Sequence, residues 1–173
     1  MKPFFLLAIL CMISVVPRQI VADVVEGACQ LSKDTDFCVS SLRSDPASQH
    51  ADLRGLASIA IKLARKNATG LMDQIAVLAN NETANADPAA QQGLFDCSDN
   101  YLDAAEQLEN SLGALSENSA HDVDVGNWVK AAVADAKSCE DALQGLKTEV
   151  AHQNRVFIAL AKNAYAIIQV LTG

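Results

Sequence analysis

The cysteines are the residues of this chain best suited to covalent or metal chemistry. Cys11 lies inside an apolar N-terminal run, which leaves an even set of four, Cys29, Cys38, Cys97 and Cys139. Four cysteines in an oxidising compartment favour disulfides, and three pairings are open. Zinc is the competing interpretation, but the chain has no C-x-x-C pair and its three histidines stand apart. We therefore expect two disulfides and no metal.

A row of acidic residues is the second pattern that could carry function. Its members recur every three or four positions: Asp96, Asp99, Asp103, Glu106 and Asn110. This is the spacing of one helix face, here turned away from the apolar residues of the same segment. Three interpretations are open: a solvated face, a docking face for a basic partner, and a glycosidase-type carboxylate pair, which would require a cleft.

The remaining polar residues predict no catalytic centre. The chain lacks G-x-S-x-G, H-E-x-x-H, phosphate-loop and dinucleotide-binding motifs. His50, His121 and His152 have no neighbouring nucleophile motif, and Ser98 has no evident base. We expect a protein without enzymatic activity and without a cofactor. Trp128 is expected at the edge of a buried helix face, with an interface anchor as the alternative.

The first 22 residues have the pattern of an export signal. Lys2 precedes the apolar run from Phe4 to Val16, which is too short to span a bilayer as a helix, and Ala22 supplies the small residue before a cleavage site. A later apolar stretch, 157–171, is interrupted by polar residues, so we expect no membrane-spanning segment. The sequence predicts a secreted protein that occupies residues 23–173.

Composition and charge narrow the class further. The chain carries 21 acidic and 13 basic residues, a net charge of −8, and becomes still more negative when the signal is removed. Such a surface repels nucleic acid and anionic lipid. Two sequons, at Asn67 and Asn81, are candidate glycosylation sites, and Asn81 is the better one because it lies near a helix end.

Apolar spacings of three and four predict an all-α fold, an up-and-down four-helix bundle preceded by an N-terminal helical hairpin. The hairpin is expected over 23–46, with Leu31 in its first helix and Asp34 or Thr35 capping its second. The bundle is expected over 51–173, with helices from about 52 to 79, from Pro88, from about 124 and from about 148. Cys97 and Cys139 fall on apolar stripes, so a bond between them would join two neighbouring helices.

Several short motifs together resemble a known plant family. They are Cys29-x8-Cys38, Ser44-Asp45-Pro46, Ala51-Asp52-Leu53-x-Gly55-Leu56-Ala57, Asp96-Cys97-Ser98-Asp99-Asn100-Tyr101, and Ser138-Cys139-Glu140-Asp141. In this order they are similar to the pectin methylesterase inhibitors and invertase inhibitors. The resemblance implies the pairs Cys29–Cys38 and Cys97–Cys139. It also implies a non-catalytic protein, here expected to be monomeric, that docks one-to-one on a carbohydrate-active enzyme of the cell wall or vacuole.

The resemblance also indicates a target. Invertase inhibitors tend to carry Pro-Lys-Phe between the disulfide-joined helices, where this chain has His121-Asp122-Val123-Asp124. In the esterase inhibitors, acidic and hydroxyl residues of those helices fill the pectin-binding cleft. The matching residues here are Asp99, Asp103, Glu106, Ser138 and Asp141. Ser138 stands where threonine is usual, and Ala134 where an acid is sometimes found. Pectin methylesterase is the expected partner, acid invertase the alternative, and a pollen or storage protein without inhibitory role the third possibility.

Overall fold

The computed structural model describes residues 23–80, 87–116, 122–143 and 149–173, and these ranges are helical with no strand among them. Two short helices and a 3-10 turn come first: α2 (Val24–Ala28), α3 (Thr35–Arg43) and η2 (Pro46–Gln49). Four long helices follow: α4 (Leu53–Ala79), α6 (Pro88–Ser116), α7 (Asp122–Ala142) and α8 (Glu149–Thr172). The predicted all-α class is confirmed.

Aspartates mark where most of these helices begin. The side chain of Asp23 accepts from the Val25 N–H, that of Asp34 from Phe37, that of Asp45 from Ala47 and that of Asp52 from Gly55. Each carboxylate thus satisfies a backbone donor that the first helical turn leaves without a partner. Asp34, rather than Thr35, is the cap of α3. At α6, Asp87 accepts from Ala89, and Pro88 occupies the first turn.

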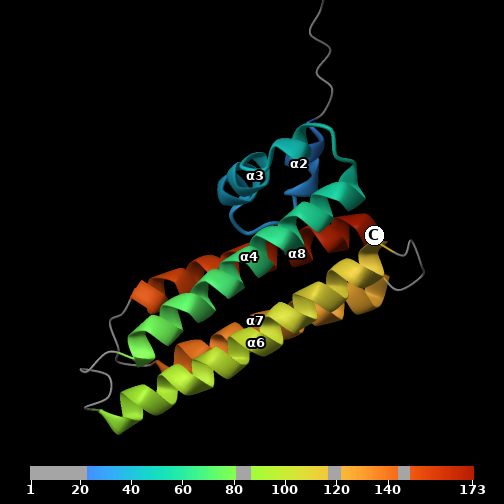
Figure 1. The fold of residues 1–173 in the computed structure, drawn as a ribbon. Coiled ribbons are helices and arrows are strands. Elements are labelled where there is room, and N and C mark those ends of the chain that lie inside the picture. Colours follow the sequence, from blue (N-terminus) through green and yellow to red (C-terminus); the bar gives the residue numbers. More distant parts are fainter. Residues whose placement is uncertain (1–22, 81–86, 117–121, 144–148) are drawn as a thin grey trace, which may run out of the picture.

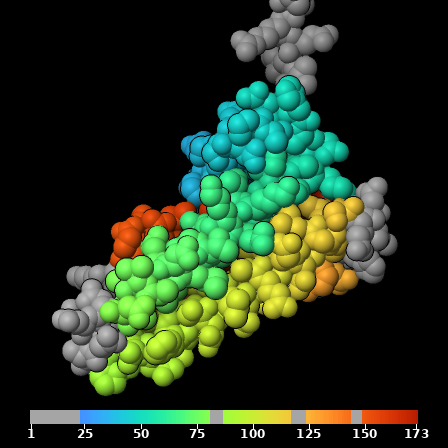
Figure 2. Space-filling view, viewed as in Figure 1, coloured from blue at the N-terminus to red at the C-terminus, as the bar shows by residue number. Residues whose placement is uncertain are grey.

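The four long helices form an antiparallel bundle of two layers (Figure 1). Helices α4 and α8 lie side by side in one layer, and α6 and α7 form the other. The hairpin of α2 and α3 packs on α4 and α8, near the start of α4 and the end of α8. Figure 2 shows it as a lobe that stands on one end of the elongated bundle. The layer of α6 and α7 therefore carries no hairpin.

The core is built from the apolar stripes that the spacing predicts. Its largest fully buried side chains come from all four long helices and the hairpin: Tyr101, Phe157, Leu42, Leu56, Ile61, Leu71, Ile75, Leu108, Ile167, Val125, Val129 and Val150. Polar groups inside the bundle are few. The Tyr101 hydroxyl donates to the Asn154 side-chain oxygen and ties α6 to α8. Burial raises the pKa of Tyr101, with a smaller contribution from the charge of Glu140, so its hydroxyl stays protonated.

The hairpin is closed by one disulfide and one ionic contact. Cys29 is bonded to Cys38, as the family resemblance implies, with the two Cα atoms 5.9 Å apart. Arg43 bonds to the carboxylates of Asp23 and Glu26, and its hydrogen bond holds the pKa of the Asp23 carboxyl below its usual value. The placement of Leu31 in the first helix is wrong. Helix α2 ends at Ala28, and Leu31 lies beyond it, 56% exposed.

Four further sequence predictions have different outcomes. The signal at 1–22 and the sequon at Asn81 lie outside the described residues. Asn67 lies within α4 and is half-buried, with a buried side-chain oxygen that has no hydrogen-bond partner. By length and composition alone, α8 is long and apolar enough to cross a membrane. Its apolar face instead forms one side of the bundle core.

Candidate functional site

The acidic row of α6 lies on the face opposite the core. Leu94, Cys97, Tyr101, Ala104 and Leu108 are buried along one side of this helix. The carboxylates of the row, on the other side, are all exposed: Asp96, Asp99, Asp103 and Glu106. Since exposed charges on a helix can be changed without disturbing the core, this face is available for recognition.

Two apolar side chains stand beside the acidic row and escaped the sequence analysis. Phe95 and Leu102 are 52% and 55% exposed. They are seven residues apart, which is nearly two helical turns, so both project from the same side of α6. In the sequence they could have been found as apolar residues that fall outside the buried stripe of α6. An aromatic ring surrounded by charges is a common anchor of a protein interface.

Helix α7 contributes the hydroxyl and the last acid of the predicted set. Ser138 and Asp141 are both exposed, and they are three residues apart along one side of the helix. The Ser138 hydroxyl donates to the backbone oxygen of Ala134 at 3.2 Å. Its oxygen keeps accepting capacity, so without a rotation it offers a partner an acceptor rather than a donor.

The contact line between α6 and α7, which we call the seam, determines how the candidate residues of α6 are positioned relative to those of α7. Cys97 and Cys139 are bonded, as the family resemblance implies, with Cα atoms 4.5 Å apart. Near one end of the seam, Gly93 lies against the backbone of Ala142, and towards the other Ser111 donates to the Val125 carbonyl at 3.2 Å. The disulfide fixes the register of the two helices, and in this register the charge of Asp103 on α6 acts on Asp135 of α7.

Asp135 completes the site, and the sequence analysis missed it. Gln107 of α6 donates to its carboxylate at 3.2 Å. Burial, and secondarily the charge of Asp103, raise its pKa to about 6. The family resemblance points to position 134 as one where an acid is sometimes found, but this chain has the exposed Ala134 there. The available signal was spacing, since Asp135 lies three residues before Ser138 and on the same flank of α7.

The predicted residues and Asp135 lie on two adjacent helices, and we call this set the acidic face: Asp96, Asp99, Asp103 and Glu106 of α6 with Asp135, Ser138 and Asp141 of α7. It lies on the outer surfaces of two helices, so it suits docking better than the cleft chemistry of a glycosidase. Among the residues described, no three histidine, cysteine or acidic side chains are placed to hold a metal ion. His50 and His152 are exposed, His121 lies outside the described ranges, and Trp128 is half-buried as expected.

Comparison with known proteins shows relatives in sequence and in fold. The sequence profile described as "Plant invertase/pectin methylesterase inhibitor" matches residues 23–167. A protein of Platanus orientalis named "Putative invertase inhibitor" is 29% identical, with 99% of each chain covered. The pectinesterase inhibitor of Actinidia deliciosa is 30% identical over 70% of this chain and 63% of its own. The crystal structure of a mutant pectin methylesterase inhibitor from Arabidopsis is 20% identical and superposes with a TM-score of 0.72, covering 86% of this chain and 97% of that one.

Proposed function

Because this chain belongs to the plant invertase/pectin methylesterase inhibitor family, whose members are non-catalytic proteins that inhibit one of these two enzymes, we propose that its target is pectin methylesterase. The inhibitor docks one-to-one, with the acidic face directed into the substrate cleft of the enzyme. Family members act in the cell wall or the vacuole. We assign this chain to the cell wall space, after removal of residues 1–22.

The observation that carries the proposal is the continuity of the acidic face across two helices. A cleft that binds de-esterified pectin must accept a polymer of carboxylates, so it presents polar and basic groups. Carboxylates of α6 and α7, held at a fixed spacing by the Cys97–Cys139 bond, have the complementary charge. Phe95 and Leu102 add the apolar contact area that charges alone do not supply.

The connection between α6 and α7 supports the esterase over the invertase. Where invertase inhibitors tend to carry Pro-Lys-Phe, this chain carries two acids, Asp122 and Asp124. Asp124 is exposed in the first turn of α7. Their negative charge is opposite to that of the lysine in the tripeptide. At a helix start this negative charge is favoured by the helix dipole.

Inhibition of acid invertase is the second candidate. The full-length similarity to the Platanus protein favours it, as does a 35% identity over 96 residues to the Arabidopsis protein named "Cell wall / vacuolar inhibitor of fructosidase 2". Both names refer to invertase-type enzymes. The two candidates differ in target and share the non-catalytic mode of action.

A parallel titration separates them. We expect the purified protein to inhibit a plant pectin methylesterase at near-stoichiometric concentration and to leave an acid invertase active. The double variant Asp103→Lys with Glu106→Lys should lose esterase inhibition by at least tenfold, because like charges then meet across the interface.

The matched control carries the same change of charge in the other layer. Asp73→Lys with Glu149→Lys alters two exposed acids of α4 and α8 and should inhibit like the wild type. Both double variants should melt within a few degrees of the wild type. Inhibition of invertase alone would establish the second candidate. Equal inhibition by the two double variants would show that the acidic face is only a solvated surface.

A further inference from the structure

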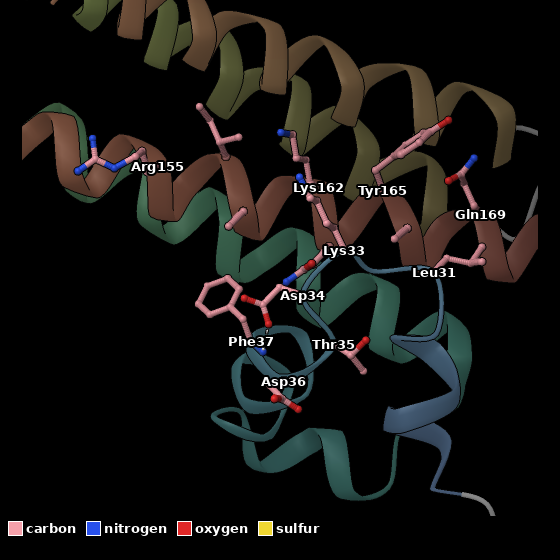
Figure 3. Close-up of a pocket in the computed structure, with 14 residues that line it drawn as sticks. Leu31, Lys33, Asp34, Thr35, Asp36, Phe37, Arg155, Lys162, Tyr165 and Gln169 are labelled. Atoms are coloured by element: carbon pink, nitrogen blue, oxygen red, sulfur yellow. Dashed lines mark hydrogen bonds between the residues drawn. The ribbon is translucent and has the colours of Figure 1, made fainter.

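A groove on the opposite layer of the molecule has features of a ligand site. It runs between α8 and the segment that joins α2 to α3, and it encloses about 810 Å³. In Figure 3 the side chains of Lys33 and Phe37 enter from the hairpin side, and those of Arg155, Lys162 and Tyr165 come from α8. This volume is within the range of small-molecule sites. Since α6 and α7 do not line it, a protein docked on the acidic face would leave it open.

The groove gathers positive charge on a strongly acidic protein. Lys33, Arg155 and Lys162 line it and are exposed, and within the described ranges none of the three has an ion-pair partner. Figure 3 shows the Lys33 side chain extending toward that of Lys162. Lys130 of α7 does not line the groove, but its ammonium lies 4.8 Å from the centre of the Tyr165 ring. Several cations around one groove favour an anionic ligand there.

Acidic groups at the groove offset this charge only in part. Asp34 and Asp36 line the hairpin side. The Asp34 carboxylate is engaged as the cap of α3, where it accepts from the Phe37 N–H at 3.0 Å. Asp36 is exposed in the first turn of that helix. The cations of α8 therefore remain the groups that face an incoming ligand from the bundle side.

An amide without a hydrogen-bond partner lies beneath the surface of the groove. Asn163 of α8 lines the groove and is only 7% exposed. Its side-chain nitrogen is buried and has no hydrogen-bond partner. Because this nitrogen is shielded from solvent, it can donate to a ligand oxygen only after the Asn163 side chain turns toward the groove.

We propose that this groove binds a short oligosaccharide that carries carboxylates. The carboxylates pair with Lys33, Lys162 and Arg155, the hydroxyl groups bond to the amide of Gln169 and, once its side chain turns outward, to that of Asn163, and the sugar rings pack on Phe37 and Tyr165. An apolar ligand would leave the cations desolvated and unpaired. A neutral sugar would do the same, and a single inorganic anion would engage only part of the hollow.

The test uses the full mature protein and a trimer of galacturonic acid, a choice that rests on the proposed esterase target. Isothermal titration should show saturable, one-to-one binding. Lys33→Glu with Lys162→Glu should weaken it at least tenfold, whereas Lys62→Glu with Lys66→Glu, two exposed cations of α4 outside the groove, should leave it within twofold. The fully methyl-esterified trimer should bind at least tenfold more weakly than the acid. In a two-dimensional NMR titration, the side-chain amide signals of Asn163 should shift.

Each other outcome overturns the proposal. No saturable binding, or equal loss in both double variants, would show that the groove is not a site. Equal affinity for the methyl ester would make it a neutral sugar site, and displacement of the trimer by an equal concentration of inorganic phosphate would make it a simple anion site. If the double variant melts early, Lys162→Gln alone should weaken binding at least threefold. Because binding of the trimer is measured without the esterase, its result does not depend on whether the protein inhibits that enzyme.

Discussion

At the residue scale, Asp135 is the acid whose pKa is raised most among the residues that the structure describes. Its carboxyl lies half-buried at the seam of α6 and α7, with Gln107 as a donor and Asp103 as a nearby like charge. A pKa of about 6 in the folded protein exceeds the value of 3.8 expected for an unfolded chain. Between these two values the folded state holds a proton that the unfolded state releases, so stability declines as pH rises from about 4 to about 6.

Replacing Asp135 by Asn should remove this decline. At pH 7 the variant should be more stable than the wild type by about 1 kcal/mol or less, because the exposed part of the carboxylate is screened by solvent. Thermal melts at pH 4, 5, 6 and 7 measure the effect, with Asp99→Asn as the exposed control. A lower melting temperature of Asp135→Asn at pH 7 would show that the ionised carboxylate stabilises the seam.

The sequence located single residues well where one helix decides their position. The spacing of 96, 99, 103 and 106 places them opposite the core stripe whatever the rest of the fold does. Asp135 was missed because its environment depends on the register between two helices, which the periodicity of neither helix contains. The groove cations were missed for the same reason, since Lys33 and Lys162 meet only through the packing of the hairpin on α8.

At the element scale, the approach of α6 to α7 depends on Gly93. A Cβ atom at this position would lie 2.5 Å from the Ala142 carbonyl oxygen, closer than real contacts allow. Gly93→Ala should therefore push the helices apart and destabilise the protein by about 1–3 kcal/mol. Gly113→Ala, in the same helix but with open space around it, should stabilise by about 0.5–1 kcal/mol. Urea denaturation of the two variants measures both changes in the free energy of unfolding. An unchanged stability of Gly93→Ala would mean that the helices can move apart at the seam without loss of stability.

The elements themselves were predicted where the signals were local. Pro88 and the aspartate caps mark helix starts, and the long apolar stripes define α4, α6 and α8. The error at Leu31 has a physical cause. Cys29 is held by its bond to Cys38, and Asp34 already starts the next helix, so residues 30–33 must cross between two helices. No local signal in the sequence indicates which apolar residue would be left outside.

At the scale of the whole molecule, one disulfide stabilises the hairpin and the other stabilises the α6–α7 layer of the bundle. Replacing Cys97 and Cys139 by Ala should cost about 4 kcal/mol, and replacing Cys29 and Cys38 about 2.6 kcal/mol, because the longer loop loses more entropy on closure. The hairpin packs on α4 and α8, so its disulfide variant should retain inhibition of the target enzyme below its melting temperature. Denaturant melts and inhibition assays on both variants check this. A hairpin variant that stays folded but no longer inhibits would mean that the hairpin belongs to the docking surface.

The bond between Cys97 and Cys139 has a consequence for proteolysis. Every backbone cut between these two residues leaves the fragments covalently joined, because both ends of the cut remain attached through the sulfur atoms. Asp99, Asp103 and Glu106 would then stay on one fragment and Ser138 and Asp141 on the other, still tethered at the seam. A protein nicked between α6 and α7 should run as one band without reductant and as two bands with it. A protease could thus cleave this inhibitor once without separating the two helices that carry its acidic face.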